Sequence, residues 1–288
     1  MTTLLAYPNF SEGRDAARIA TLTAALGAGL VDVHVDPDHH RTACTVLGRP
    51  GELAEAVLGG ARAAVELVSL DAHEGVHPRV GALDVAPIVW LDDADRGAAC
   101  AEALVLADRL AAELGLPVFL YGALAGGRTR AELRRGGRDE LGRRIASGEL
   151  RPEFGPPGLH PTAGATLVAA RPPLVAFNVV LDASATLDDA RAVAAAIREG
   201  GEAGLPGVRA IGVWLPGRGV AQVSTNLDEP RRVSAAEVLA AVARRVSVAG
   251  AELVGLAPEA ALREFPSDVA LTGRATIEDA LAARSHTD

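Results

Sequence analysis

The sequence predicts an α/β (α+β) protein made of two successive β-α-β-β-α-β units, and three observations support this fold class. Short β-rich runs alternate with segments of helical period along the 288 residues. The same order of elements occurs twice. In each unit a tight turn, at residues 36–41 and 216–219, separates the two middle strands. Tight hairpins make antiparallel neighbours, which argues against a single doubly wound parallel sheet.

The first unit contains four predicted strands and two predicted helices. The strands lie at residues 3–7, 30–35, 42–48 and 85–91, and the helices at 14–28 and 52–69. In the second helix Leu53, Val57 and Ala61 recur on one face, while the charged residues lie elsewhere. This amphipathic pattern is typical of a helix packed on a sheet.

The second unit repeats this order after a connecting region. That region holds a helix (94–114), a strand (117–121), another helix and a Pro/Gly-rich loop. The repeated elements are a strand (174–182), a helix (187–199), two strands (208–215 and 219–225), a helix (235–248) and a strand (251–256). Ser234 and Glu237 form a Ser-x-x-Glu capping box at the start of the last helix. The order predicts two ferredoxin-like subdomains, residues 1–173 and 174–288.

Composition excludes several classes of function. All 28 basic residues are Arg, which excludes Schiff-base chemistry and a P-loop lysine. A net charge of −9 and only nine aromatic residues argue against a nucleic-acid-binding protein. The two cysteines, Cys44 and Cys100, form no disulfide framework or zinc motif, and we expect both to pack. There is no long apolar run and no leader pattern, so we expect no membrane association and a cytoplasmic location.

Five of the seven histidines lie between residues 34 and 77. His34, Asp36, His39 and His40 offer imidazole and carboxylate ligands at close range, as a metal-dependent hydrolase would need. The alternative interpretation is a solvated polar hairpin tip. The spacing matches no metal motif, and we expect no metal.

Three loops are candidate positions for a site: residues 8–13, 71–84 and 148–164. In the second loop His77 precedes Pro78, which stiffens the chain, and a histidine of near-neutral pKa suits general-base catalysis. In the first loop Ser11 is either an ordinary helix cap or part of an anion site at a helix start.

Sequence blocks distributed over most of the chain resemble one known family. They are PNFSEG (8–13), HPRVGALDVAP (77–87), PVFLYG (117–122), GATLVAARPPLVAFNVVL (164–181), AQVSTNL (221–227) and AELVGLAP (251–258). They occur in family order and resemble glutamate formimidoyltransferase, the formiminotransferase domain family. The resemblance implies two ferredoxin-like subdomains in a homodimer. It further implies transfer of a formimidoyl group from N-formimino-L-glutamate to N5 of tetrahydrofolate, a co-substrate, in histidine degradation and one-carbon metabolism.

The resemblance also implies site residues. The catalytic histidine of the family heads the HPR-x-GALD motif, which places it at His77. The folate-lining loop of the family aligns with residues 155–164. Its matching positions are Gly155, Pro156, Pro161, Thr162 (a Ser in the family) and Gly164.

Further candidates for substrate binding are Asn9, Glu12, Arg41, Arg79, Asp84 and Tyr121. Asp84 or Glu12 would orient His77 or hold the amidine, and Arg41 and Arg79 would bind carboxylates. Tyr7, Phe10, Tyr121 and Phe154 are the aromatic candidates for packing on a pterin, in a cleft between the subdomains.

The sequence departs from the family pattern at several positions that concern the pocket. A family Glu is Ala123, a frequent Trp is Ala163, and His34 and His40 replace an Asp and an Asn. These departures leave the donor and acceptor open. A same-fold transferase with another donor or acceptor, and a non-catalytic folate-binding protein, therefore remain as alternatives.

Overall fold

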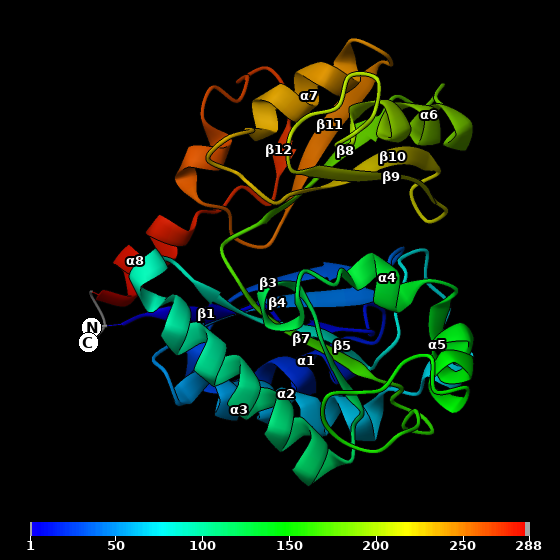
Figure 1. Cartoon of the computed structure of the whole chain (residues 1–288). Helices are drawn as coiled ribbons and strands as arrows, with labels where there is room; N and C mark the ends of the chain where they lie inside the picture. The colour runs from blue at the N-terminus through cyan, green and yellow to red at the C-terminus, as the bar shows by residue number, and fades with distance from the viewer. Residues whose placement is uncertain (1, 286–288) are drawn as a thin grey trace. The chain divides into compact units, whose positions relative to one another are not determined.

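The computed structural model describes residues 2–285 (Figure 1). Its contacts divide the chain into two compact units, Met1–Pro172 (unit 1) and Pro173–Asp288 (unit 2). Each unit has its own sheet and its own hydrophobic core, which confirms the predicted fold class. The subdomain boundary at 173/174 stays a prediction. Across the described part of the chain, no helix combines the length and apolar character needed to cross a membrane.

Unit 1 is built on a seven-stranded sheet. Its strands are β1 (Leu4–Ala6), β2 (Asn9–Phe10), β3 (Leu30–Asp36), β4 (Arg41–Gly48), β5 (Leu83–Trp90), β6 (Val118–Leu120) and β7 (Thr166–Arg171). β1 and β2 occupy one strand position, since both pair with β4 and β5. β3 pairs antiparallel with β4, which completes the predicted ferredoxin-like order. β7 and β6 extend the sheet beyond β5 as parallel strands.

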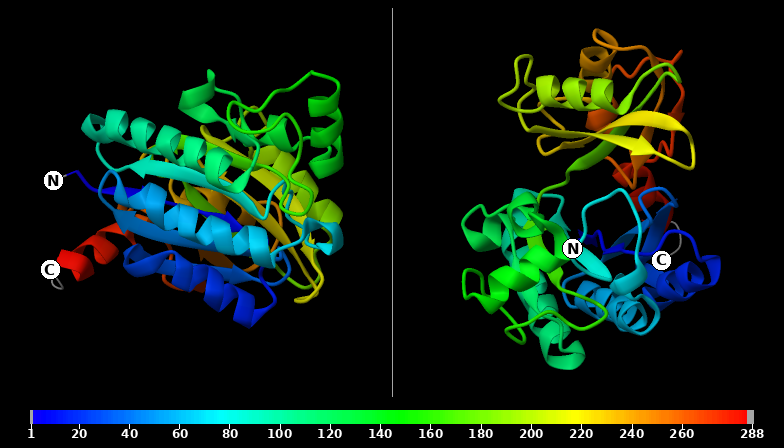
Figure 2. Two further views of the ribbon diagram at one scale, coloured as in Figure 1. Left: turned by 90° about the horizontal axis from the view of Figure 1, so that it is seen from below. Right: turned by 90° about the vertical axis from the view of Figure 1, so that its right-hand side faces the viewer.

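Helices cover both faces of this sheet. They are α1 (Ala16–Ala25), α2 (Glu52–Leu67), α3 (Arg96–Leu114), α4 (Arg130–Arg134) and α5 (Gly137–Ala146). α1, α2 and α3 lie along one face, where they enclose the larger core (Figure 2). α4 and α5 contribute Leu133, Leu141 and Ile145 to a second core with residues of β5, β6 and β7. The end of the sheet formed by these three strands is therefore buried on both faces.

Unit 2 has a five-stranded sheet in the order β12-β11-β8-β10-β9. Its elements are β8 (Val175–Leu181), α6 (Leu187–Ile197), β9 (Val208–Leu215), β10 (Val220–Leu227), α7 (Ala235–Ala243), β11 (Val248–Val254), β12 (Leu271–Thr272) and α8 (Ile277–Ser285). α6 and α7 pack on one face around Phe177 and Val223. The capping box of Ser234 and Glu237 is confirmed. Short 3-10 turns occur at Gly27–Gly29, Leu70–Ala72, Asp93–Asp95, Gly122–Ala125 and Glu259–Leu262.

Some predicted boundaries were wrong. The helix predicted at 235–248 ends at Ala243, and β11 begins at Val248, because the chain there already pairs with β8. β7 was not predicted as a strand. It is a continuous apolar run between two parallel neighbours, so it lacks the alternation that marks a half-buried strand.

Candidate functional site

The loop that carries His77 connects the turn at Leu70–Ala72 to β5. The contacts of Asp84 stabilise the end of this loop. One carboxylate oxygen of Asp84 accepts the backbone N–H of Val80 at 2.7 Å. The other forms an ion pair with Arg134 of α4. Asp84 is almost fully buried. These two contacts hold the loop against α4, so Asp84 supports the loop, and its predicted role toward His77 or the amidine stays a prediction.

Two glycines let the loop lie directly against the residues that immediately precede β7. Gly81 and Gly164 form an antiparallel bridge. A Cβ at Gly81 would lie 2.0 Å from the carbonyl oxygen of Ala165, and one at Gly164 would lie 2.1 Å from that of Val80. Gly164 also has a φ of +72°. The glycines in the two sequence blocks are thus required by backbone contact next to the candidate base.

The PNFSEG segment docks on the same loop. The Ser11 hydroxyl donates to the carbonyl of Gly81 at 2.7 Å, and the Ser11 amide donates to that of Ala82 at 2.8 Å. Ser11 is therefore no helix cap; Asp15 caps α1 instead. One oxygen of Glu12 accepts the amides of residues 13–15 at 2.9–3.1 Å. Burial raises the pKa of Glu12, but the hydrogen bonds from the amides of Arg14 and Asp15 and the contact with His40 outweigh it, so the pKa is lowered. Glu12 holds the turn before α1, and its predicted role toward His77 or the amidine stays a prediction.

His77 is half-buried and lines a pocket of about 610 Å³. The loop, the turn before it and the start of α5 form the pocket wall: Leu70, Asp71, Gly75, Val76, His77, Pro78, Arg79, Gly136, Gly137, Arg138 and Asp139. Removal from water lowers the pKa of His77 well below 6.5, and the positive charges of Arg41 and Arg134 lower it further. The ring is therefore neutral near pH 7 and able to accept a proton.

The His-rich turn after β3 is buried, so the prediction of a solvated hairpin tip was wrong. The side chains of Asp36 and His39 are 3% and 2% exposed, and Nδ1 of His39 lies 2.7 Å from Oδ2 of Asp36. The His39 ring centroid lies 6.0 Å from that of His77. At this turn the structure shows a hydrogen-bonded His–Asp pair beside the candidate base, and the expectation that no metal binds there stays a prediction.

His40 and His73 form a second histidine pair, with stacked rings 4.0 Å apart. Nε2 of His40 lies 3.2 Å from a carboxylate oxygen of Glu12, and Nδ1 lies 2.9 Å from the carbonyl of Glu74. Burial lowers the pKa of His73 to about 4, with further contributions from Arg79 and His40. These contacts join the His-rich turn to the loop that carries His77.

The two arginines predicted to bind carboxylates, Arg41 and Arg79, have different surroundings. Arg79 donates to the carbonyls of Gly75 at 3.0 Å and His77 at 3.1 Å, and also to that of His73. Its guanidinium therefore stabilises its own loop, and the prediction that it clamps a substrate carboxylate is not supported by these bonds. Arg41, at the start of β4, is one of the positive charges that act on His77.

The aromatic candidates for packing on a pterin also differ in their burial. Phe10 has no exposed surface and belongs to the core under α1 and α2, so its assignment to a pterin site was wrong. Tyr121 is 5% exposed, and among the described residues its hydroxyl has no hydrogen-bond partner. Phe154 and Tyr7 are half-buried. Asn9, the remaining substrate candidate, donates to the carbonyl of Tyr7 at 3.0 Å.

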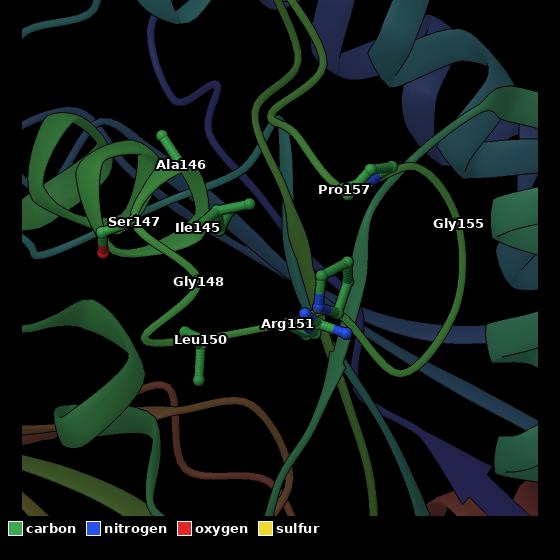
Figure 3. Close-up of a pocket in the computed structure, with 9 residues that line it drawn as sticks. Ile145, Ala146, Ser147, Gly148, Leu150, Arg151, Gly155 and Pro157 are labelled. Carbon is green, nitrogen blue, oxygen red and sulfur yellow. The ribbon is translucent and has the colours of Figure 1, made fainter.

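The predicted folate loop, residues 155–164, approaches two pockets in unit 1. Gly155 lines a separate pocket of about 490 Å³ with Ser147, Arg151 and Pro157 (Figure 3). Pro161 accepts a hydrogen bond from Arg138, and the carbonyl of Thr162 accepts the amide of Leu70 at 3.0 Å. Arg138 and Leu70 both line the pocket of His77, so the second half of this loop lies near the candidate base.

The departures from the family pattern also differ in environment. Ala163 is 1% exposed within the larger core, where a tryptophan would overpack its neighbours. Ala123 lies in an exposed turn, which has room for a larger side chain.

The sequence reasoning missed several residues near His77. Arg134 and Arg138 lie in or beside the pocket, and Arg130 adds to the positive charge at His77. The signal that could have identified them is the density of arginines over residues 128–138. The pairing of Asp36 with His39 was also missed, because their contact depends on a buried turn.

Comparison with known proteins identifies both units. Residues 3–171 match the family model "Formiminotransferase domain, N-terminal subdomain", and residues 176–267 match "Formiminotransferase domain". The chain is 38% identical to glutamate formimidoyltransferase of Streptococcus pyogenes over 267 residues, which cover 88% of the chain and 89% of that relative. It is 34% identical to glutamate formimidoyltransferase of Thermoplasma acidophilum over 276 residues, covering 91% and 90%.

A longer relative matches over part of its length. The chain is 39% identical to formimidoyltransferase-cyclodeaminase of Sus scrofa over 277 residues, which cover 88% of the chain and 50% of that relative. The chain thus spans about half the length of this relative and most of the length of the two microbial ones.

Proposed function

Because the chain belongs to the formiminotransferase domain family, we propose that it is an enzyme that transfers a formimidoyl group from N-formimino-L-glutamate to N5 of tetrahydrofolate. The observation that carries the proposal is the position of His77. It heads the HPRVGALD block and lines a pocket among the positive charges of Arg41, Arg134 and Arg130. A donor with two carboxylates is attracted to such a pocket even though the whole chain has a net charge of −9.

The chemistry needs one group that first accepts and then donates a proton. The amine of the acceptor attacks the amidine carbon and must lose a proton, and the departing glutamate nitrogen must gain one. His77 is neutral before the attack, so it accepts the first proton and returns it to the leaving nitrogen. General acid–base catalysis of this kind contributes about 10²–10⁴-fold to the rate.

Neighbouring groups fit the two substrates. We assign the donor carboxylates to Arg41 and to the first amides of α5, which have no partner inside their own helix. We assign folate to the loop at 155–164, where Pro161 and Thr162 contact the pocket wall. Within the described part of the chain, the hydroxyl of Tyr121 has no hydrogen-bond partner. It is therefore a candidate hydrogen-bond donor to either substrate.

Three further expectations belong to this proposal. Tetrahydrofolate is a co-substrate, the reaction needs no metal, and the enzyme is a cytoplasmic homodimer. Light scattering on the purified protein checks the dimer, and cell fractionation checks the location.

The direct test mixes the protein with tetrahydrofolate and N-formimino-L-glutamate and follows the absorbance of the formimidoyl-folate product. We expect turnover that requires both substrates and leaves L-glutamate as the second product. Reactions without folate, and with L-glutamate as the donor, are the controls. Tight folate binding without turnover would instead support a non-catalytic folate-binding protein.

A second candidate function is a transferase with another donor or acceptor. The observation that favours it is His40, which stands where the family pattern has Asn and contacts Glu12 at 3.2 Å. N-formyl-L-glutamate and N-formimino-L-aspartate, supplied with tetrahydrofolate, test this alternative. Faster turnover with either one than with N-formimino-L-glutamate would favour it.

A further inference from the structure

Two hydrogen bonds and a close backbone approach hold the turn at residues 37–40 against the loop that carries His77. The amide of Val76 donates to the carbonyl of Asp38 at 3.2 Å. Nδ1 of His40 donates to the carbonyl of Glu74 at 2.9 Å. At Gly75 the backbones approach so closely that a Cβ would lie 2.6 Å from the carbonyl oxygen of His39. These contacts fix the distance between His39 and His77.

Asp36 determines which nitrogen of His39 carries a proton. One oxygen of Asp36 accepts the backbone amide of His39 at 2.9 Å, which orients the carboxylate. The other oxygen lies 2.7 Å from Nδ1 of His39, in a site where both side chains are buried. A carboxylate only accepts, so the neutral His39 ring carries its proton on Nδ1, and Nε2 keeps its lone pair.

The surroundings of the two histidines differ in charge. His77 has Arg41 and Arg134 near it, and their positive charges make a second cation at His77 unfavourable. His39 has the carboxylate of Asp36 in direct contact, which compensates a positive charge on its ring. His77 thus lies among positive charges, whereas His39 lies against a negative one.

We propose that the Asp36–His39 pair stores the transferred proton for His77, an inference that rests on the proposed function. The proton leaves the attacking amine for His77 and passes to Nε2 of His39, across the 6.0 Å between the ring centroids, through one water molecule. It returns by the same route to the departing glutamate nitrogen. Asp36 and His39 form no bond to substrate, and no proton is gained or lost overall. His39 is thus a positioning residue that acts through His77.

The decisive variant is Asp36→Asn. Its amide NH₂ group would face Nδ1 of His39. Because that group is a donor, the ring proton of His39 would move to Nε2, and His39 could no longer accept a proton from His77. We expect kcat to fall about 10–100-fold, with the KM of both substrates within about 2-fold of wild type. We expect the same loss in His39→Gln, and no further loss in the double variant, because the two residues act as one unit.

Glu74→Gln is the matched control. It also changes a carboxylate to an amide in the docked loops, but this side chain is exposed, and its backbone contact to His40 remains. We expect its kcat within about 2-fold of wild type. Circular dichroism establishes that each variant is folded, and nitrogen NMR of the histidine rings reports the His39 tautomer in wild type and in Asp36→Asn.

The outcomes separate the two proposals. Wild-type turnover with unchanged kcat in Asp36→Asn and His39→Gln would overturn the proton store alone. A rise in KM without a fall in kcat, or an Nε2 proton on His39 in wild type, would do the same. Absence of wild-type turnover would overturn the proposed function, and the proton store with it.

Discussion

His77 combines a lowered pKa with a place in a pocket wall, and both properties make predictions for its substitution. In His77→Gln, we expect kcat to fall at least about 10²-fold, because the variant lacks the imidazole that accepts the proton. Steady-state kinetics with both substrates provides the measurement. The thermal melting temperature should change little, because the ring is half-buried in a loop. A variant with near wild-type kcat would contradict the role.

The pH dependence of the wild-type rate tests the same residue. The base form of His77 predominates above its lowered pKa, so kcat/KM should stay constant as the pH falls from 8 to about 6.5 and decrease only below that. A pH series of initial rates measures this. An acid limb centred above pH 7 would show that the charges near His77 do not act as described.

His73 predicts a pH dependence of stability. Its pKa is about 4 in the folded protein and 6.5 without the surrounding structure. The unfolded state therefore binds more protons between these values, so the free energy of unfolding is highest above pH 6.5 and decreases towards pH 4. Urea unfolding at pH 7 and pH 5 should show a smaller loss in His73→Gln than in wild type. Equal losses would contradict the assigned cause.

At the scale of residues, the sequence could predict which residues belong to a site more reliably than it could predict the surroundings of each side chain. His77 was placed by its motif, and the structure puts it in a pocket wall. The surroundings of Phe10, Arg79 and Asp36 depend on burial and on partners that lie far along the chain or across a turn. Phe10 is buried in the core, Arg79 bonds to its own loop, and Asp36 pairs with His39. None of these facts follows from spacing along the chain.

The element that depends most on a single residue is the loop before β5. In Gly81→Ala, the new Cβ would lie 2.0 Å from the carbonyl of Ala165, and backbone cannot yield as a flexible side chain can. We expect a loss of about 2 kcal/mol or more in the free energy of unfolding, together with loss of activity as the loop moves. Urea unfolding and the transferase assay measure the two effects.

Gly97→Ala is the matched control for this substitution. Gly97 lies in the first turn of α3, and a Cβ there would meet nothing within 4 Å. We expect stability equal to wild type or up to about 1 kcal/mol higher, because alanine favours helix. If both glycine variants were equally stable, the close approach at Gly81 would not be what holds the loop.

Helices and hairpins were predicted well, because period and turn residues are local signals. α2 begins at Glu52 as expected, and β9 and β10 pair as a hairpin. β6 and β7 show the limit of this reasoning. They join the sheet as parallel strands beside β5, a long-range pairing that no local pattern specifies.

For the whole molecule, metal removal tests the remaining alternative that the sequence suggested, a metal-dependent hydrolase. In the described structure His39 and Asp36 bond to each other, and both ring nitrogens of His40 have acceptors nearby. We therefore expect dialysis against EDTA to leave activity and melting temperature unchanged. Elemental analysis of the purified protein provides an independent measurement. A stoichiometric metal, or a large loss of stability on chelation, would support the hydrolase.

The division into two units affects how the gene could be handled. Every strand pairing that the structure gives lies within Met1–Pro172 or within Pro173–Asp288, and so does every hydrophobic core. The chain passes between the units at Pro172–Pro173. A break at this peptide bond would interrupt no sheet. The two halves could therefore be encoded separately, labelled with different isotopes and mixed, so that each is observed by NMR without signals from the other.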